Sequence, residues 1–335
     1  RVDVVRAVRA AERQLRVIPH LEGHRAARRG DRCADGEIDV RVDPQDREVQ
    51  RARAAQRQRQ RAAAAFARSH AGVAHAKASA AVFEVCEYNV VTQQLQIGDH
   101  TFSPDLVQAE LQRRGVKKVL LECTTLGTAE IALFCRALAG LNGITLNFLY
   151  VEPKTYPTVL HEGVIHRRDF ELSTRFHGFS PVPGMCYQMD EEVSQTTVLL
   201  LGFEGDRAQR AFEELKISPS SISAVFGVPA YQPGWEYDAF ANNLVTLGSR
   251  DINRGVHFCG ADNPKATLQY LSILRSNYPL EDTLFVAPLG PKPQALGAVL
   301  FAAFSDRVGL LYDFPVRKSS RSKSIAKWHL FQAQW

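Results

Sequence analysis

Over residues 81–335, apolar runs of strand length alternate with segments that have the hydrophobic spacing of helices. Clear examples are the apolar runs 117–124 and 283–289, which are followed by helical patterns at 127–143 and 291–304. Because a helix between two strands returns the chain to the same end of a sheet, this alternation predicts parallel strands. We therefore expect an α/β fold of the Rossmann-like class, with a mainly parallel sheet and helices on both of its faces.

The same patterns predict further elements in this region. The expected strands are 81–91, 94–98, 144–151, 196–202, 222–228, 255–260 and 307–314. The expected helices are 103–115, 206–216, 237–248 and 263–277. Residues 152–195 are rich in Pro, Gly, His and aromatic side chains, so we interpret them as an irregular insertion in this domain.

Residues 1–80 have a different composition, which is dominated by Arg, Ala, Gln and Asp. They contain no Trp or Tyr, and their only Phe and Lys are Phe66 and Lys77. Segment 51–71 has helix formers but no continuous apolar stripe, so it cannot bury enough apolar surface to offset the entropy of ordering. We expect a disordered or mis-annotated extension, read upstream of the true start. A basic arm that contacts nucleic acid remains the alternative.

Several classes of protein lack their usual signals here. The six cysteines form no CxxC pair, which favours reduced thiols in a cytoplasmic protein. The most apolar long window, 131–151, contains Arg136, so no membrane span is expected. The GxGxxG, P-loop and GxSxG motifs are absent, and no cofactor is expected. In HEGVIH, residues 161–166, the histidines lack the HExxH spacing, so no metal site is expected.

Two segments, 119–156 and 282–319, resemble each other. Each has an apolar strand, a turn with Leu-Gly at its centre, an apolar helix, and a strand that ends in Leu-Tyr before an acidic residue, a proline and a basic residue. The Leu-Gly pairs stand at 126–127 and 289–290. Either an internal strand–turn–helix–strand duplication or the general likeness of such units accounts for the pattern. A duplication would place two equivalent loops at the carboxyl edge of one sheet.

That edge is where open α/β sheets bind their ligands. The start of a helix adds free backbone N–H groups and a partial positive charge, which favour a phosphate group. The first turn offers hydroxyl groups, and the second turn offers a lysine. The candidate ligand-binding residues are Thr124, Thr125, Gly127, Thr128, Gly290, Lys292, Tyr312, Arg317 and Lys318. A tight turn with a helix cap is the structural alternative for each loop.

The second turn lies in VAPLGPKPQALGAVLF, residues 286–301. This stretch resembles the ligand-binding turn of CRISPR-associated Rossmann-fold (CARF-like) sensor domains in prokaryotic antiviral defence systems, in which a Gly-rich or Thr/Gly/Lys turn precedes an apolar helix. Residues 289–293 occupy the place of that turn, and TTLGTAE, residues 124–130, would be a second one. The resemblance covers these two short stretches. It implies recognition of a cyclic or linear oligonucleotide ligand by a homodimer.

Two other classes of function remain open. Residues 161–192 are dense in His, Arg and acidic side chains, so His161 or His166 could serve a nucleotide-directed hydrolase or transferase by acid–base catalysis. The third class is a non-catalytic protein-interaction scaffold. The basic tail, 316–332, is expected to be either a solvated loop or a phosphate or nucleic-acid contact. Asp206 is expected to cap the helix that follows it.

Overall fold

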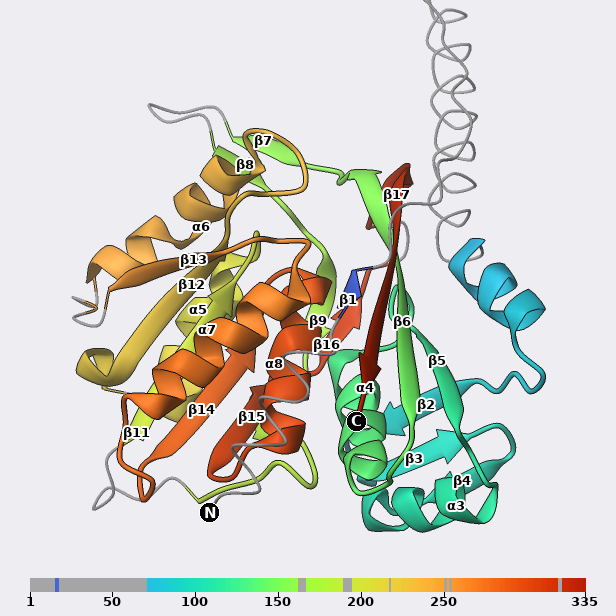
Figure 1. Cartoon of the computed structure of the whole chain (residues 1–335). Coiled ribbons are helices and arrows are strands. Elements are labelled where there is room, and N and C mark those ends of the chain that lie inside the picture. The colour runs from blue at the N-terminus through green and yellow to red at the C-terminus, as the bar shows by residue number, and fades with distance from the viewer. Residues whose placement is uncertain are drawn as a thin grey trace, which may run out of the picture.

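The computed structural model of the chain is a mixed α/β structure (Figure 1). The structure describes residues 16–17, 71–161, 167–188, 195–216, 218–249, 252, 255–318 and 321–335. Its strands fall into several sheets, with both parallel and antiparallel pairs. The expectation of one sheet therefore needs correction, because the predicted elements are shared between two larger sheets and some smaller ones.

The first large sheet has the strand order β10-β15-β14-β11-β12-β13. Its strands are β10 (Ser180–Pro181), β11 (Gln195–Leu201), β12 (Ile222–Gly227), β13 (Val256–Cys259), β14 (Thr283–Pro288) and β15 (Val308–Tyr312). Neighbours are parallel from β15 to β13, whereas β10 joins β15 in the antiparallel sense. Strands β11, β12 and β13 thus follow one another across the sheet in chain order, and β14 then pairs with β11 on its other side.

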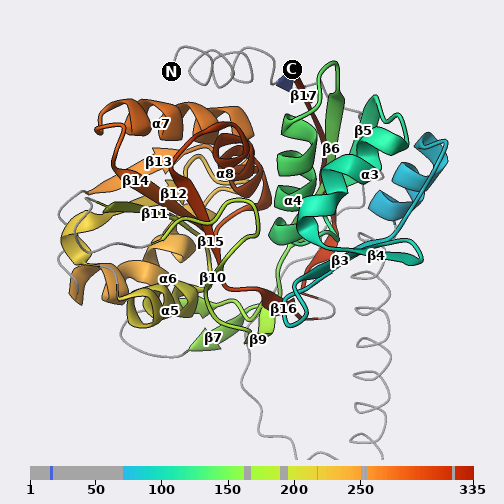
Figure 2. The ribbon, with the colours of Figure 1, turned by 90° about the horizontal axis from the view of Figure 1, so that it is seen from below.

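Four helices connect these parallel strands: α5 (Gly205–Leu215), α6 (Trp235–Ser249), α7 (Pro264–Ser276) and α8 (Lys292–Phe304). Figure 2 shows α5 and α6 on one face of the sheet and α7 and α8 on the other. Successive strand residues point to opposite faces. Val198 and Leu200 accordingly join the core beneath α7 and α8, while Leu199 and Leu201 join the core beneath α5 and α6.

The second large sheet has the order β1-β17-β6-β5. Its strands are β1 (Arg16–Val17), β5 (Lys118–Glu122), β6 (Thr145–Thr155) and β17 (Lys323–Gln334). Helix α4 (Thr128–Ala139) connects the parallel strands β5 and β6. It also packs against α8, which is buried along almost its whole length between the two sheets (Figure 1).

The basic tail is the main correction to the predicted elements. Residues 323–334 form β17, which runs antiparallel to β6 along most of its length. The side chains of His329, Phe331 and Ala333 are buried, and those between them are more exposed. This period of two is typical of a half-buried strand, and the local density of lysine and serine concealed it.

The smaller elements flank these two sheets. A three-stranded sheet contains β2 (Cys86–Asn89), β3 (Gln94–Ile97) and β4 (His100–Phe102), and is followed by the 3-10 turn η1 (Pro104–Leu106) and α3 (Val107–Arg113). The expected irregular insertion, 152–195, contains short strands: β7 (Val159–His161), β8 (Arg167–Asp169), β9 (Ser173–Phe176) and β10. Strand β9 pairs with β16 (Pro315–Arg317), and the 3-10 turn η2 (Pro219–Ser221) precedes β12.

The expected extension, 1–80, lies largely outside the described residues. Residues 71–79 are helical, and the ring of His75 lies 5.6 Å from that of Trp328 in β17. Strand β1 pairs with the same strand. Among the helices that the structure describes, none combines the length and the apolar character that crossing a membrane requires.

Candidate functional site

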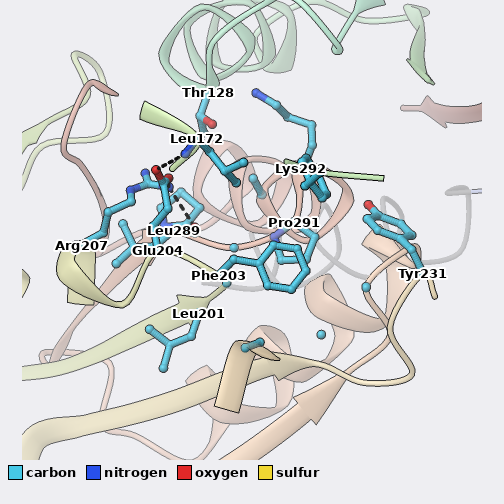
Figure 3. Close-up of a pocket in the computed structure, with 18 of the residues that line it drawn as sticks. Thr128, Leu172, Leu201, Phe203, Glu204, Arg207, Tyr231, Leu289, Pro291 and Lys292 are labelled. Atoms are coloured by element: carbon cyan, nitrogen blue, oxygen red, sulfur yellow. Dashed lines mark hydrogen bonds and ion pairs between the residues drawn. The ribbon is translucent and has the colours of Figure 1, made fainter. Parts of the chain in front are cut away.

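A cavity of ≈ 100 Å³ lies beyond the carboxyl ends of β11 and β14 (Figure 3). Residues that follow β11, β12 and β14 line it, together with residues from the start of α4. Small-molecule pockets usually occupy ~300–1,000 Å³. This cavity is therefore of a size for a small compound or for one group of a larger ligand, such as a phosphate.

The two Leu-Gly turns meet at this cavity. The Lys292 amine at the start of α8 donates a hydrogen bond to the Leu126 carbonyl oxygen before α4, at 2.9 Å. The turns follow β5 and β14, which belong to different sheets, so the expectation that both turns lie at the edge of one sheet is wrong. They meet because α4 and α8 pack against each other.

Glu122, at the end of β5, organises the first turn. Its carboxylate accepts hydrogen bonds from the backbone N–H groups of Thr124 and Thr125, at 3.0 and 2.9 Å, and from the Thr125 hydroxyl at 2.6 Å. The Thr124 hydroxyl oxygen accepts a hydrogen bond from the Val151 N–H at 2.9 Å. The polar groups of Thr124 and Thr125 are therefore engaged by the protein itself.

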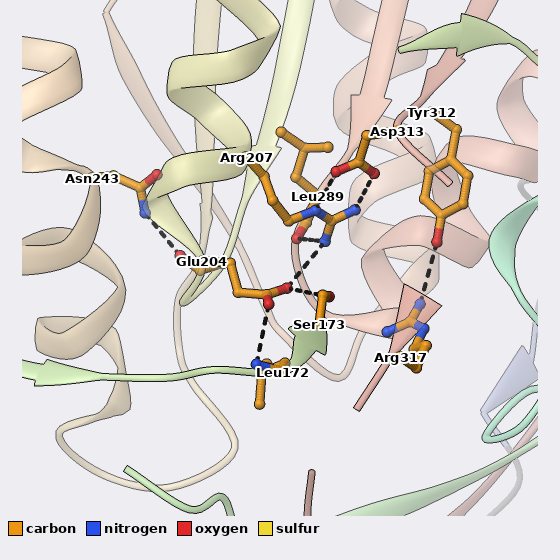
Figure 4. Close-up of polar contacts among 10 residues, drawn as sticks. Leu172, Ser173, Glu204, Arg207, Asn243, Leu289, Tyr312, Asp313 and Arg317 are labelled. Carbon is orange, nitrogen blue, oxygen red and sulfur yellow. Dashed lines mark hydrogen bonds and ion pairs between the residues drawn. The ribbon is translucent and has the colours of Figure 1, made fainter. Parts of the chain in front are cut away.

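Arg207 of α5 holds the second turn in place (Figure 4). Its guanidinium makes two hydrogen bonds to the Asp313 carboxylate, at 2.7 and 2.6 Å, and one to the Leu289 carbonyl oxygen at 2.9 Å. Burial by itself would lower the pKa of Arg207, but the Asp313 carboxylate raises that pKa above its ordinary value. The charge of Arg207 is therefore balanced within the protein.

The beginning of α5 corrects a further expectation. The N-cap position belongs to Glu204, and Asp206 lies inside the first turn of the helix. The Glu204 carboxylate accepts hydrogen bonds from the Leu172 N–H at 3.1 Å and from the Ser173 hydroxyl at 3.2 Å (Figure 4). Glu204 thereby ties the segment before β9 to the rim of the cavity.

Lys292 is 8% exposed, and within the described part of the chain no ion pair involves its amine. Burial lowers the pKa of Lys292 well below its ordinary value, and the positive charges of Arg317 and Arg321 lower it further. Both arginines line the same cavity. Arg317 also donates a hydrogen bond to the Tyr312 hydroxyl at 3.2 Å. The cavity wall thus brings the guanidinium groups of Arg317 and Arg321 close to an amine whose protonated form is disfavoured.

The structure brings most of the candidate ligand-binding residues together. Those that line the cavity are Thr124, Thr128, Gly290, Lys292, Tyr312 and Arg317. The cavity lining does not include Thr125, Gly127 or Lys318. The Lys318 amine instead pairs with the Glu171 carboxylate, and both side chains are exposed.

Of the aromatic side chains on the cavity wall, Tyr312 was predicted from the sequence and the others were missed. The missed side chains are Tyr150, Tyr156, Phe203, Tyr231 and Trp235. Tyr231 and Trp235 come from the chain after β12, whose carboxyl end lies at the same sheet edge as those of β11 and β14. An inspection of every predicted strand end would have included them. Burial raises the pKa of Tyr231 well above its ordinary range, so its hydroxyl group keeps its proton.

The alternative acid–base site, at His161 or His166, involves side chains that the structure does not describe. His166 lies outside the described residues, and the side chain of His161 is not described either. His177 lines a different hollow, beside β2 and β3. In the described ranges, no group of three or more His, Cys, Asp and Glu side chains is arranged to hold a metal ion.

Comparison of the chain with protein-family models, curated proteins and solved structures found no match.

Proposed function

We propose that this cavity binds a phosphate group of a nucleotide or oligonucleotide ligand, and that the protein is a ligand sensor of a defence system. The observation that carries the proposal is the set of nitrogen hydrogen-bond donors on the cavity wall. The side chains of Lys292, Arg317 and Arg321 all line the cavity. A phosphate could accept hydrogen bonds from these groups, and its negative charge would favour protonation of the Lys292 amine on binding.

The strand order supports the proposal. The order β13-β12-β11-β14-β15 corresponds to the sequence order 3-2-1-4-5 within this segment, as in Rossmann-like sheets. In such sheets, ligands bind outside the carboxyl ends of the strands, where the order of the connections reverses. That point lies between β11 and β14, and the cavity is lined by the residues that follow both strands.

The aromatic wall suits the rest of a nucleotide. Phe203 and Trp235 line the cavity, with their ring centroids 5.5 Å apart, and Tyr156 lies 5.2 Å from Trp235. Aromatic side chains stack on nucleobases with little preference for sequence. These rings would contact the part of the ligand that adjoins the bound phosphate.

Ligand binding should raise the thermal stability of the whole chain. We would test cyclic and linear oligonucleotides, mononucleotides and NAD. A ligand at about 100 times its dissociation constant should add ~2.7 kcal/mol to the free energy of unfolding. The Arg317→Gln variant should lose this effect. Lys318→Gln is the matched control. Lys318 is the next residue after Arg317, but its amine pairs with the Glu171 carboxylate outside the cavity. Equal ligand effects in both variants would contradict the assigned role of Arg317.

A cooperatively folded protein that responds to none of these ligands would contradict nucleotide binding. That result would favour two alternatives: each turn is only a tight turn with a helix cap, and the protein is a protein-interaction scaffold. The homodimer that the CARF-like resemblance implies remains a prediction, which light scattering on the purified chain tests.

A further inference from the structure

Lys292 has an unusual environment for a charged side chain. Its amine is buried, and the hydrogen-bond partner that the structure gives it is a neutral carbonyl oxygen, that of Leu126, at 2.9 Å. A buried ammonium without a counter-ion is strongly disfavoured, so such an amine tends to lose its proton. Two guanidinium groups, those of Arg317 and Arg321, line the same cavity and act in the same direction.

A lysine amine that is neutral near pH 7 is a nucleophile. Desolvation and a neighbouring cation are the two devices that activate lysines for attack on carbonyl groups. Both devices are present around Lys292. The cavity of ≈ 100 Å³ is also a suitable size for a compound of a few carbon atoms.

The other groups on the cavity wall match one class of carbonyl compound. Arg317 and Arg321 present guanidinium groups that can hold a carboxylate in a forked arrangement. The Tyr231 hydroxyl, which keeps its proton, can donate a hydrogen bond to a carbonyl oxygen. Tyr231 and Lys292 are both among the residues that line the cavity (Figure 3).

From this arrangement we propose that Lys292 forms an imine with a small 2-oxo acid, whose carboxylate is held by Arg317 and Arg321. The lysine nitrogen forms a bond to the carbonyl carbon. The two protons of the neutral amine leave with the carbonyl oxygen as water, and a C=N double bond remains. No oxidant or reductant takes part in this step. The proposal goes beyond nucleotide binding and does not depend on it.

Reductive trapping tests this proposal on the full chain. The protein is incubated with glyoxylate or pyruvate and borohydride, which reduces an imine to a stable secondary amine, and the modified lysines are mapped by peptide mass spectrometry. We expect modification at Lys292 to be at least about tenfold faster than at Lys265, because each unit by which a pKa is lowered raises the neutral fraction about tenfold. Lys265 is the matched control, since it lies in the first turn of α7 beside Pro264 and outside the cavity.

Two further comparisons separate the parts of the proposal. Propanal carries an aldehyde but no carboxylate, so it should modify Lys292 more slowly than glyoxylate does; equal rates would overturn the role of the arginines. The Lys292→Met variant has no amine at this position and cannot form an imine, so the adduct at residue 292 should vanish.

Modification of Lys292 at or below the rate of Lys265 would overturn the proposal. That comparison is made within one wild-type chain, so it holds even if a variant fails to fold. Nucleotide binding is measured without carbonyl compound or borohydride, which keeps the two tests separate.

Discussion

The two Leu-Gly turns have the same local sequence pattern but different roles in the structure. In the turn before α4, Glu122 binds the backbone of the turn, and the Thr124 hydroxyl binds the neighbouring strand. In the turn before α8, Lys292 extends across the cavity to the first turn. The first turn is therefore occupied with its own hydrogen bonds, while the second turn brings the Lys292 amine to the cavity. A shared sequence pattern predicts shared local structure, and the long-range contacts decide which turn can serve a ligand.

The largest effect should come from the ion pair that anchors the second turn. The Arg207 and Asp313 side chains are 5% and 2% exposed. In the Asp313→Asn variant, Arg207 would keep its charge in a buried site and lose its closest counter-ion, with the Glu204 carboxylate remaining 3.8 Å away. Breaking a buried pair typically costs ~3–5 kcal/mol. Denaturant unfolding measures this cost. Glu171→Gln breaks the exposed pair with Lys318 and should cost at most about 1 kcal/mol. Similar losses in the two variants would contradict the anchoring role.

Alanine at the glycine of each turn gives a direct comparison of the two. A Cβ atom at Gly290 would stand 2.6 Å from the Leu201 carbonyl oxygen, so the backbones of two strand ends would have to separate. We expect Gly290→Ala to cost ~1–3 kcal/mol in the free energy of unfolding. At Gly127 the nearest atoms belong to the flexible carboxylate end of Glu130, so Gly127→Ala should cost less than about 1 kcal/mol. The reverse order would show that the first turn is the more tightly packed one.

The smallest change per step of the measurement is expected in the dependence of stability on pH. The pKa of Lys292 is lowered in the folded protein. Between the two pKa values, the unfolded chain therefore binds a proton at Lys292 that the folded chain does not bind. Stability should therefore rise with pH between the folded pKa and the unfolded value near ~10.4, with a slope of at most about 1.4 kcal/mol per pH unit from this group. The Lys292→Met variant should lose this contribution, and Lys265→Met should retain it. Unfolding curves from pH 7 to 9 measure the difference in slope, and equal slopes in Lys292→Met and wild type would refute the prediction.

The sequence predicts the parts of the fold that depend on local pattern. The expected helices at 127–143 and 291–304 correspond to α4 and α8, and the expected strand 283–289 corresponds to β14. Hydrophobic spacing and turn residues act over a few positions, so one sequence is enough to find these elements. Strand β17 was not predicted, because its lysines and serines are typical of a loop and its pairing partner, β6, is remote in the chain.

For the candidate site, too, local sequence patterns predicted some features and long-range packing decided the others. The sequence by itself determined that two apolar strands end in Leu-Gly turns, that a helix begins after each, and that Lys292 stands at the second. Only the tertiary structure decided that the two turns face one cavity from different sheets, that Tyr231 and Trp235 complete its wall, and that Lys318 lies outside it. The physical reason is that local periodicity fixes the elements, whereas the packing of α4 against α8 brings together residues more than a hundred positions apart.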